Sequence, residues 1–186
     1  GQIHLVSEKK EIPVQRIPET GRYYRFQNTI MNRYLSTDAA SSQTFSTTQE
    51  GGNTVFYYDA SQLLSYDRGQ YLQGAVLADT EQAGTAVAIT PSLAQEAYRY
   101  NIVFAGTDYL RLYNEDSTPN TTGAKTSAQK AKAYNFRCVQ VLALPVKMNA
   151  DGWAAFSAGV PVCIPQGCTA YVAEAYNPAN ASLSLK

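Results

Sequence analysis

Tyrosines that stand beside an acid or an amide are the residues of this chain best suited to ligand chemistry. A tyrosine ring can stack on the apolar face of a sugar, while its hydroxyl and a neighbouring carboxylate or amide bind the sugar's hydroxyl groups. The alternative for each tyrosine is packing in a β-sheet core. The candidate ligand-binding residues on this reasoning are Tyr57, Tyr58, Asp59, Tyr66, Asp67, Tyr113 and Asn114.

Catalytic chemistry is not predicted. The chain has one histidine, His4, in a polar N-terminal stretch, and a nucleophile activated by a general base would have to use it. Most aspartates fall in predicted turns, where the side chain bonds the nearby backbone. Zinc-ligand spacing, a phosphate-binding loop and a dinucleotide fingerprint are all missing from the sequence. We therefore expect no enzyme activity, no cofactor and no metal.

Charge and hydropathy exclude two further classes of protein. The 15 basic and 15 acidic residues give zero formal charge without a basic stripe, which argues against nucleic-acid binding. The apolar runs are far shorter than the roughly 20 residues of a membrane-spanning helix. Hydrophobic residues make up 45% of the chain, which is ordinary for a packed domain.

A Tyr-Leu pair recurs three times, at 34–35, 71–72 and 109–110, each time after a polar turn. Even spacing of about 38 residues predicts a threefold internal repeat. Short segments with period-two alternation, such as Tyr24 and Phe26 flanked by polar residues, indicate that each repeat is built of β-strands. We assign the tyrosines and leucines of these pairs to the core of an all-β fold.

The pattern divides the chain into three parts: a leader at 1–20 with one edge strand, the repeats at 21–143, and a segment of short strands at 144–186. The last segment is too small to fold alone, so we expect a neighbouring domain or a partner chain to cover its edge. Cys163 and Cys168 flank a predicted turn at 164–167, and a disulfide there depends on the register of the hairpin.

Two stretches resemble known families. Residues 21–28, followed by 33–36, resemble the opening of ricin-B-like and fascin-like β-trefoils in secreted or surface proteins of Bacteroidetes-type bacteria. The resemblance implies four strands per repeat, a six-stranded barrel capped by three hairpins, and an extracellular or cell-surface location. Residues 151–156 and 160–171 are similar to the start of a β-sandwich module in multidomain proteins of the same bacteria.

The chain departs from ricin-type trefoils where they bind sugars. Those domains carry a Gln-x-Trp element in each repeat, whereas the single Trp153 of this chain lies outside the repeats. We expect a non-catalytic binding module that recognises a glycan or polysaccharide through shallow sites on the trefoil rim. The alternatives are a protein-interaction or spacer domain of a larger secreted assembly and a Kunitz-trefoil-like protease inhibitor that uses the loop at 114–124.

Overall fold

The computed structural model describes residues 5–6, 11–28, 32–37, 44–46, 51–59, 61–79, 84–92, 96–111, 125–127, 135–146, 153–155, 161–163, 170–172 and 182–185. These residues form β-strands, with one 3-10 turn at Gly52–Thr54 (η1), so the all-β prediction is confirmed for the described part of the chain. The chain divides into two compact units, Ile12–Gln140 and Gly1–Glu11 with Val141–Lys186.

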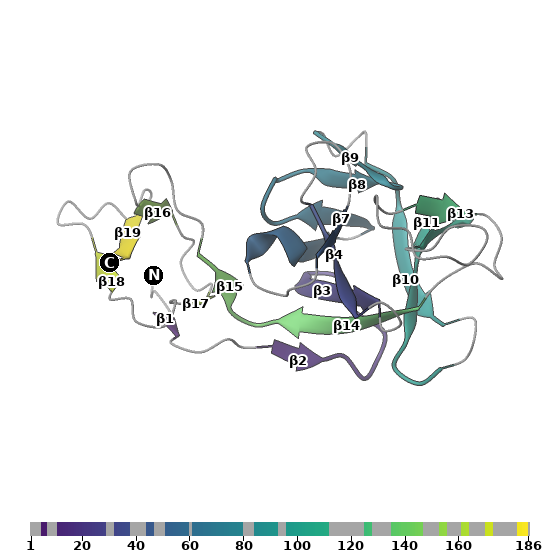
Figure 1. Ribbon diagram of the computed structural model, residues 1–186, viewed down its shortest axis with the longest axis horizontal. Helices are drawn as coiled ribbons and strands as arrows, with labels where there is room; N and C mark the ends of the chain where they lie inside the picture. Colours follow the sequence, from purple (N-terminus) through teal and green to yellow (C-terminus); the bar gives the residue numbers. More distant parts are fainter. Residues whose placement is uncertain are drawn as a thin grey trace. The chain divides into compact units, whose positions relative to one another are not determined.

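The strands described between residues 22 and 141 fall into three repeats of four, and Figure 1 labels most of them. The first repeat has β3 (Arg22–Asn28), β4 (Arg33–Ser36), β5 (Thr44–Ser46) and β6 (Phe56–Asp59). The second has β7 (Gln62–Ser65), β8 (Tyr71–Gln73), β9 (Val76–Ala78) and β10 (Val87–Pro91). The third has β11 (Tyr100–Phe104), β12 (Asp108–Arg111), β13 (Lys125–Ser127) and β14 (Phe136–Val141).

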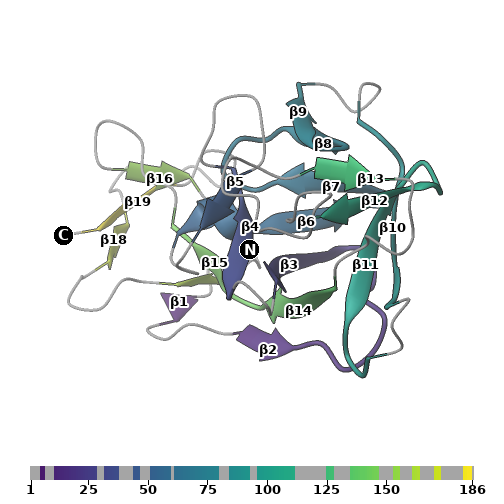
Figure 2. The ribbon, with the colours of Figure 1, turned by 45° about the vertical axis from the view of Figure 1, so that its right-hand side comes forward.

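The first and fourth strands of the repeats form a barrel. Antiparallel pairing joins β14 to β3, β3 to β6 and β6 to β7, and these strands lie side by side in Figure 2. It also joins β10 to β11 and β11 to β14. Between β7 and β10, the Val87 amide donates a hydrogen bond to the carbonyl of Ser61 at 2.5 Å. The second and third strands of each repeat form hairpins, β4–β5, β8–β9 and β12–β13.

The hydrophobic core repeats the same threefold order. Equivalent strands of the three repeats pair in the same register, so each repeat supplies one residue to each of four sets of equivalent core positions. We call each of these sets a layer. Every one of these side chains is buried. The layers are Phe26, Leu63 and Ile102; Leu35, Leu72 and Leu110; Phe56, Val87 and Phe136; and Tyr58, Ile89 and Cys138.

The leucines of the Tyr-Leu pairs have the structural role that the sequence predicts. Leu35, Leu72 and Leu110 are at most 1% exposed and belong to the core. Side chains alternate across a strand, so the tyrosine before each leucine faces away from it. Tyr34 and Tyr109 are nevertheless buried, at 9% and 8% exposed.

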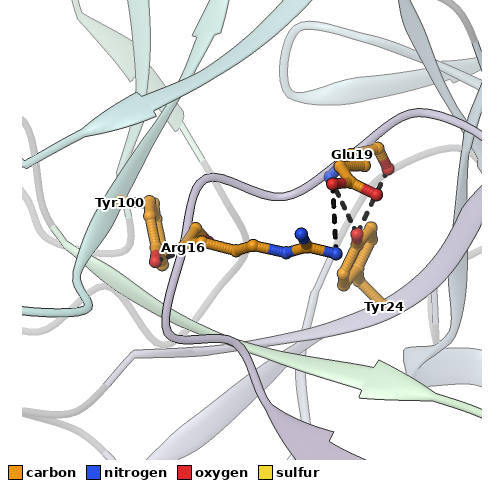
Figure 3. Close-up of polar contacts among 4 residues, drawn as sticks. All are labelled: Arg16, Glu19, Tyr24 and Tyr100. Carbon is orange, nitrogen blue, oxygen red and sulfur yellow. Dashed lines mark hydrogen bonds and ion pairs between the residues drawn. The ribbon is translucent and has the colours of Figure 1, made fainter.

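The part of the predicted leader from residue 12 to residue 20 packs on the barrel. Strand β2 (Glu11–Pro13) pairs with β14, and Val14 belongs to the core. The hydroxyl of Tyr100 donates to the carbonyl of Arg16 at 2.6 Å, and the hydroxyl of Tyr24 accepts from the amide of Glu19 at 2.9 Å (Figure 3). Two core tyrosines therefore fix this segment by their polar ends.

The smaller unit has two three-stranded sheets. In the first, β1 (Leu5–Val6) and β15 (Leu144–Pro145) both run parallel to β17 (Val162–Cys163). In the second, β19 (Ser182–Leu185) pairs antiparallel with β16 (Trp153–Ala155) and β18 (Ala170–Val172). The described strands on either side of the predicted hairpin at 160–171, β17 and β18, do not pair with each other and belong to different sheets. Residues 164–169, which include Cys168, lie outside the described residues.

Candidate functional site

Three half-buried tyrosines gather on the outside of the barrel, and we call Tyr23, Tyr57 and Tyr66 the tyrosine cluster. Tyr23 of β3 lies opposite Tyr57 of β6, and their ring centroids are 4.8 Å apart at an interplanar angle of 44°. Tyr66 follows β7 and meets Tyr23 edge to face, with centroids 6.1 Å apart at 87°. Both geometries are favourable for aromatic pairs.

The other two repeats carry different residues at the equivalent positions. Tyr57 lies between core residues 56 and 58, just as Ala88 lies between 87 and 89, and Arg137 between 136 and 138. The amide of Tyr66 donates to the carbonyl at 55, and the amide of Ala105 makes the same hydrogen bond to the carbonyl at 86. Ala88 and Ala105 are exposed. The barrel therefore closes without aromatic rings at these positions.

The backbone beside the cluster leaves room for the ring of Tyr66. A methyl group placed on Gly52, in η1, would lie 3.0 Å from Cδ1 and 3.2 Å from Cε1 of Tyr66, closer than normal contact distances of about 3.5–4.0 Å. The same methyl group would lie 3.5 Å from Oδ1 of Asp67. Glycine at position 52 thus sets the place of the Tyr66 ring and of the adjoining carboxylate.

The hydroxyl groups of Tyr66 and Tyr23 have raised pKa values and stay protonated well above neutral pH. Burial, followed by the nearby Tyr23 and Asp67, raises the pKa of Tyr66 to about 12. Burial, and then Tyr57, also raises the pKa of Tyr23. The phenols of Tyr66 and Tyr23 can therefore each donate and accept a hydrogen bond, beside rings that offer apolar faces and the exposed carboxylate of Asp67.

The structure places the predicted site residues in three different settings. Tyr57, Tyr66 and Asp67 come together at the cluster. Tyr58 is only 8% exposed and fills a core layer, so its ring is not available for stacking on a ligand. Asp59 is half-buried at the end of β6, opposite Gln62.

Tyr113 and Asn114 lie outside the described residues, as do His4 and the loop at 114–124. Sequence reasoning missed Tyr23. The strand pattern contained the signal, because Tyr24 and Phe26 face the core and alternation turns Tyr23 outward on the same strand.

A hollow lies along the segment before the first repeat. Its volume is about 240 Å³, and it is lined by Ile12, Pro13, Val14, Gln15, Arg16 and Gln140. The guanidinium of Arg16 pairs with the carboxylate of Glu19 at 3.1 Å (Figure 3), and no aromatic ring lines this hollow. It offers less to a sugar than the tyrosine cluster does.

In the described part of the chain, no group of three His, Cys, Asp or Glu side chains is placed to hold a metal ion. No helix among the same residues has the length and apolar character needed to cross a membrane.

Comparison with known proteins adds one finding. No family model matches the sequence, and no curated protein matches it. Among solved structures, a Macrolepiota procera ricin B-like lectin in complex with lactose is similar, with a TM-score of 0.52 and 15% sequence identity over 66% of this chain and 98% of that chain. Such a likeness concerns the fold alone, and together with the strand pairing it confirms the predicted β-trefoil.

Proposed function

We propose that the chain is a non-catalytic carbohydrate-binding module, and that its site is the tyrosine cluster with Asp67. One observation carries this proposal: two of the three rings, those of Tyr57 and Tyr66, stand at barrel positions where another repeat has an exposed alanine. Closure of the barrel therefore does not account for the aromatic residues at these two positions. The lectin whose fold is similar binds a disaccharide, which supports the same class of ligand.

The chemistry fits a neutral sugar. Stacking on a tyrosine ring removes the apolar face of a pyranose from water, and the phenols and Asp67 supply hydrogen bonds to its hydroxyl groups. The cluster lies on the outer surface of the barrel and is not enclosed, so we expect weak binding per site and recognition of a segment of a longer glycan.

A glycan array with matched variants tests the proposal. The barrel tolerates alanine at the position equivalent to 57, so Tyr57→Ala should fold normally. Tyr98→Ala removes a tyrosine that is 53% exposed outside the cluster and serves as the control. We expect selective binding by the wild type and by Tyr98→Ala, and loss of binding by Tyr57→Ala. A blank array from folded protein would count against the proposal and favour the protein-interaction alternative.

An extracellular or cell-surface location stays a prediction from the family resemblance. The same holds for a partner that covers the edge of residues 144–186. The protease-inhibitor alternative rests on the loop at 114–124 and also stays untested.

A further inference from the structure

Two arginines occupy the barrel positions that correspond to the tyrosine pair. Tyr100 lies opposite Phe136 in the β11–β14 ladder. Continuing this antiparallel register by one residue brings Arg99, which immediately precedes β11, opposite Arg137. These two positions are related by the threefold repeat to Tyr23 and Tyr57, because Tyr24 opposes Phe56 in the same way. Directly opposite residues have Cβ atoms about 4.5–5.5 Å apart, so two cationic side chains start from neighbouring points on the surface.

Nothing in the described part of the chain neutralises this pair. Both arginines are half-buried. Among the described residues, the guanidinium of Arg99 donates one hydrogen bond, from Nη1 to the carbonyl of Tyr98 at 3.3 Å, and no ion pair is formed by Arg99 or Arg137. The neighbouring carboxylate of Glu96 accepts a hydrogen bond from Nδ2 of Asn135 at 2.5 Å.

A structural arginine in the same barrel shows the contrast. Arg25 is 1% exposed, and its Nη1 donates to the carbonyl of Gly51 at 3.0 Å and to the hydroxyl of Thr54. That side chain is buried and satisfied by the protein. Like charges opposite each other on neighbouring strands destabilise a sheet, and the exposed Ala88 shows that the barrel does not require arginine at position 137.

The residue opposite Arg137 on β3 is neutral and polar. Arg137 lies opposite Gln27 of β3 on its other side, and Nε2 of Gln27 donates to Oδ1 of Asn32 at 2.6 Å. The row of residues 99, 137 and 27 thus presents two guanidinium groups next to a fixed amide. Guanidinium groups match the geometry of sulfate, phosphate and carboxylate through paired N–H donors.

We propose that Arg99 and Arg137 form a binding site for an oxyanion, carried by a ligand as a sulfate, phosphate or carboxylate group. An oxyanion between the two side chains would turn their mutual repulsion into two charge-assisted interactions. The site occupies positions that the threefold repeat separates from the tyrosine cluster. Oxyanion binding here and carbohydrate binding at the cluster can therefore be tested independently.

Backbone amide shifts in a ¹⁵N NMR titration test the site directly. Sodium sulfate is added to the wild-type chain at constant ionic strength, with sodium chloride as the balancing salt, and sodium acetate is the second probe. We expect saturable shifts centred on residues 99 and 137 with sulfate, and the acetate arm tells whether a planar carboxylate is also accepted. Shifts absent from both residues, or shifts that sulfate and chloride produce equally, would overturn the proposal.

Thermal unfolding supplies a second readout with matched variants. Sulfate stabilises most proteins by exclusion from their surface, so the relevant quantity is the difference between variants. Arg137→Gln and the control Arg16→Gln each remove one positive charge, and the side chain of Arg16 is 75% exposed. At low ionic strength in chloride, Arg137→Gln should raise Tm, and it should reduce the extra gain that sulfate gives. Equal behaviour of the two variants would contradict the site.

Discussion

Gly52→Ala should weaken glycan binding without removing any atom of the tyrosine cluster. The new Cβ would lie 3.0 Å from Cδ1 of Tyr66, and ordinary contact begins near 3.5 Å, so the ring must move by about 0.5 Å. The backbone at position 52 is not in the left-handed region, so alanine brings no strain of its own. Binding sites need their groups within about 0.5 Å of the productive geometry. We therefore expect a three- to ten-fold loss of affinity, about 0.6–1.4 kcal/mol.

A double-mutant cycle isolates the cause of that loss. Affinity is measured by isothermal titration calorimetry for the wild type, Gly52→Ala, Tyr66→Ala and the double variant. If the methyl group acts by displacing the ring, Gly52→Ala should change nothing once the ring is absent. An equal loss in both backgrounds, or no loss in the wild-type background, would refute the reasoning.

Three further predictions concern stability. Leu72→Ala should lower the free energy of unfolding, measured by urea denaturation, by about 2–5 kcal/mol. The control Val76→Ala, at a position that is 45% exposed, should change it by less than about 0.5 kcal/mol in the same assay. Tyr98 has φ of 56°, so Tyr98→Gly should raise the free energy of unfolding by up to about 1 kcal/mol in the same assay. The pKa of Tyr66 is raised from 10.0 to about 12 in the folded protein. The stability that the protonated phenol contributes is therefore fully present below pH 10 and is lost as the pH rises from 10 to 12. Between these values the wild type should lose stability more steeply than Tyr66→Phe in urea denaturation, and parallel curves would contradict the raised pKa.

The fold was accessible from the sequence because the repeat is carried by core residues. Leucines 35, 72 and 110 occupy one layer, and their spacing is visible in the chain. Strands without such a marker were missed. Strand β9 is only three residues long and begins two residues after Gly74. Strand β13 begins at Lys125, directly after the polar stretch at 114–124. Pairing with β8 and β12 creates these strands, and pairing between distant segments leaves little trace in local composition.

The candidate site was accessible only in part, for a reason that lies in strand register. Tyr57 and Tyr58 are adjacent and chemically identical, yet one faces outward and the other fills the core. A shift of one residue exchanges these faces, and the sequence around Asp59 does not fix the register. Tyr23 joins Tyr57 through the β3–β6 ladder, a contact between residues far apart in the chain.

The most direct test of the tyrosine cluster is the affinity of one array-selected glycan for Tyr57→Ala and Tyr98→Ala, measured by isothermal titration calorimetry. The cluster predicts a loss of at least about ten-fold for Tyr57→Ala, equal to 1.4 kcal/mol, and less than two-fold for Tyr98→Ala. Circular dichroism should show both variants folded, since the equivalent of position 57 in the second repeat is Ala88. Unchanged affinity in folded Tyr57→Ala would contradict the assignment of the site to the cluster.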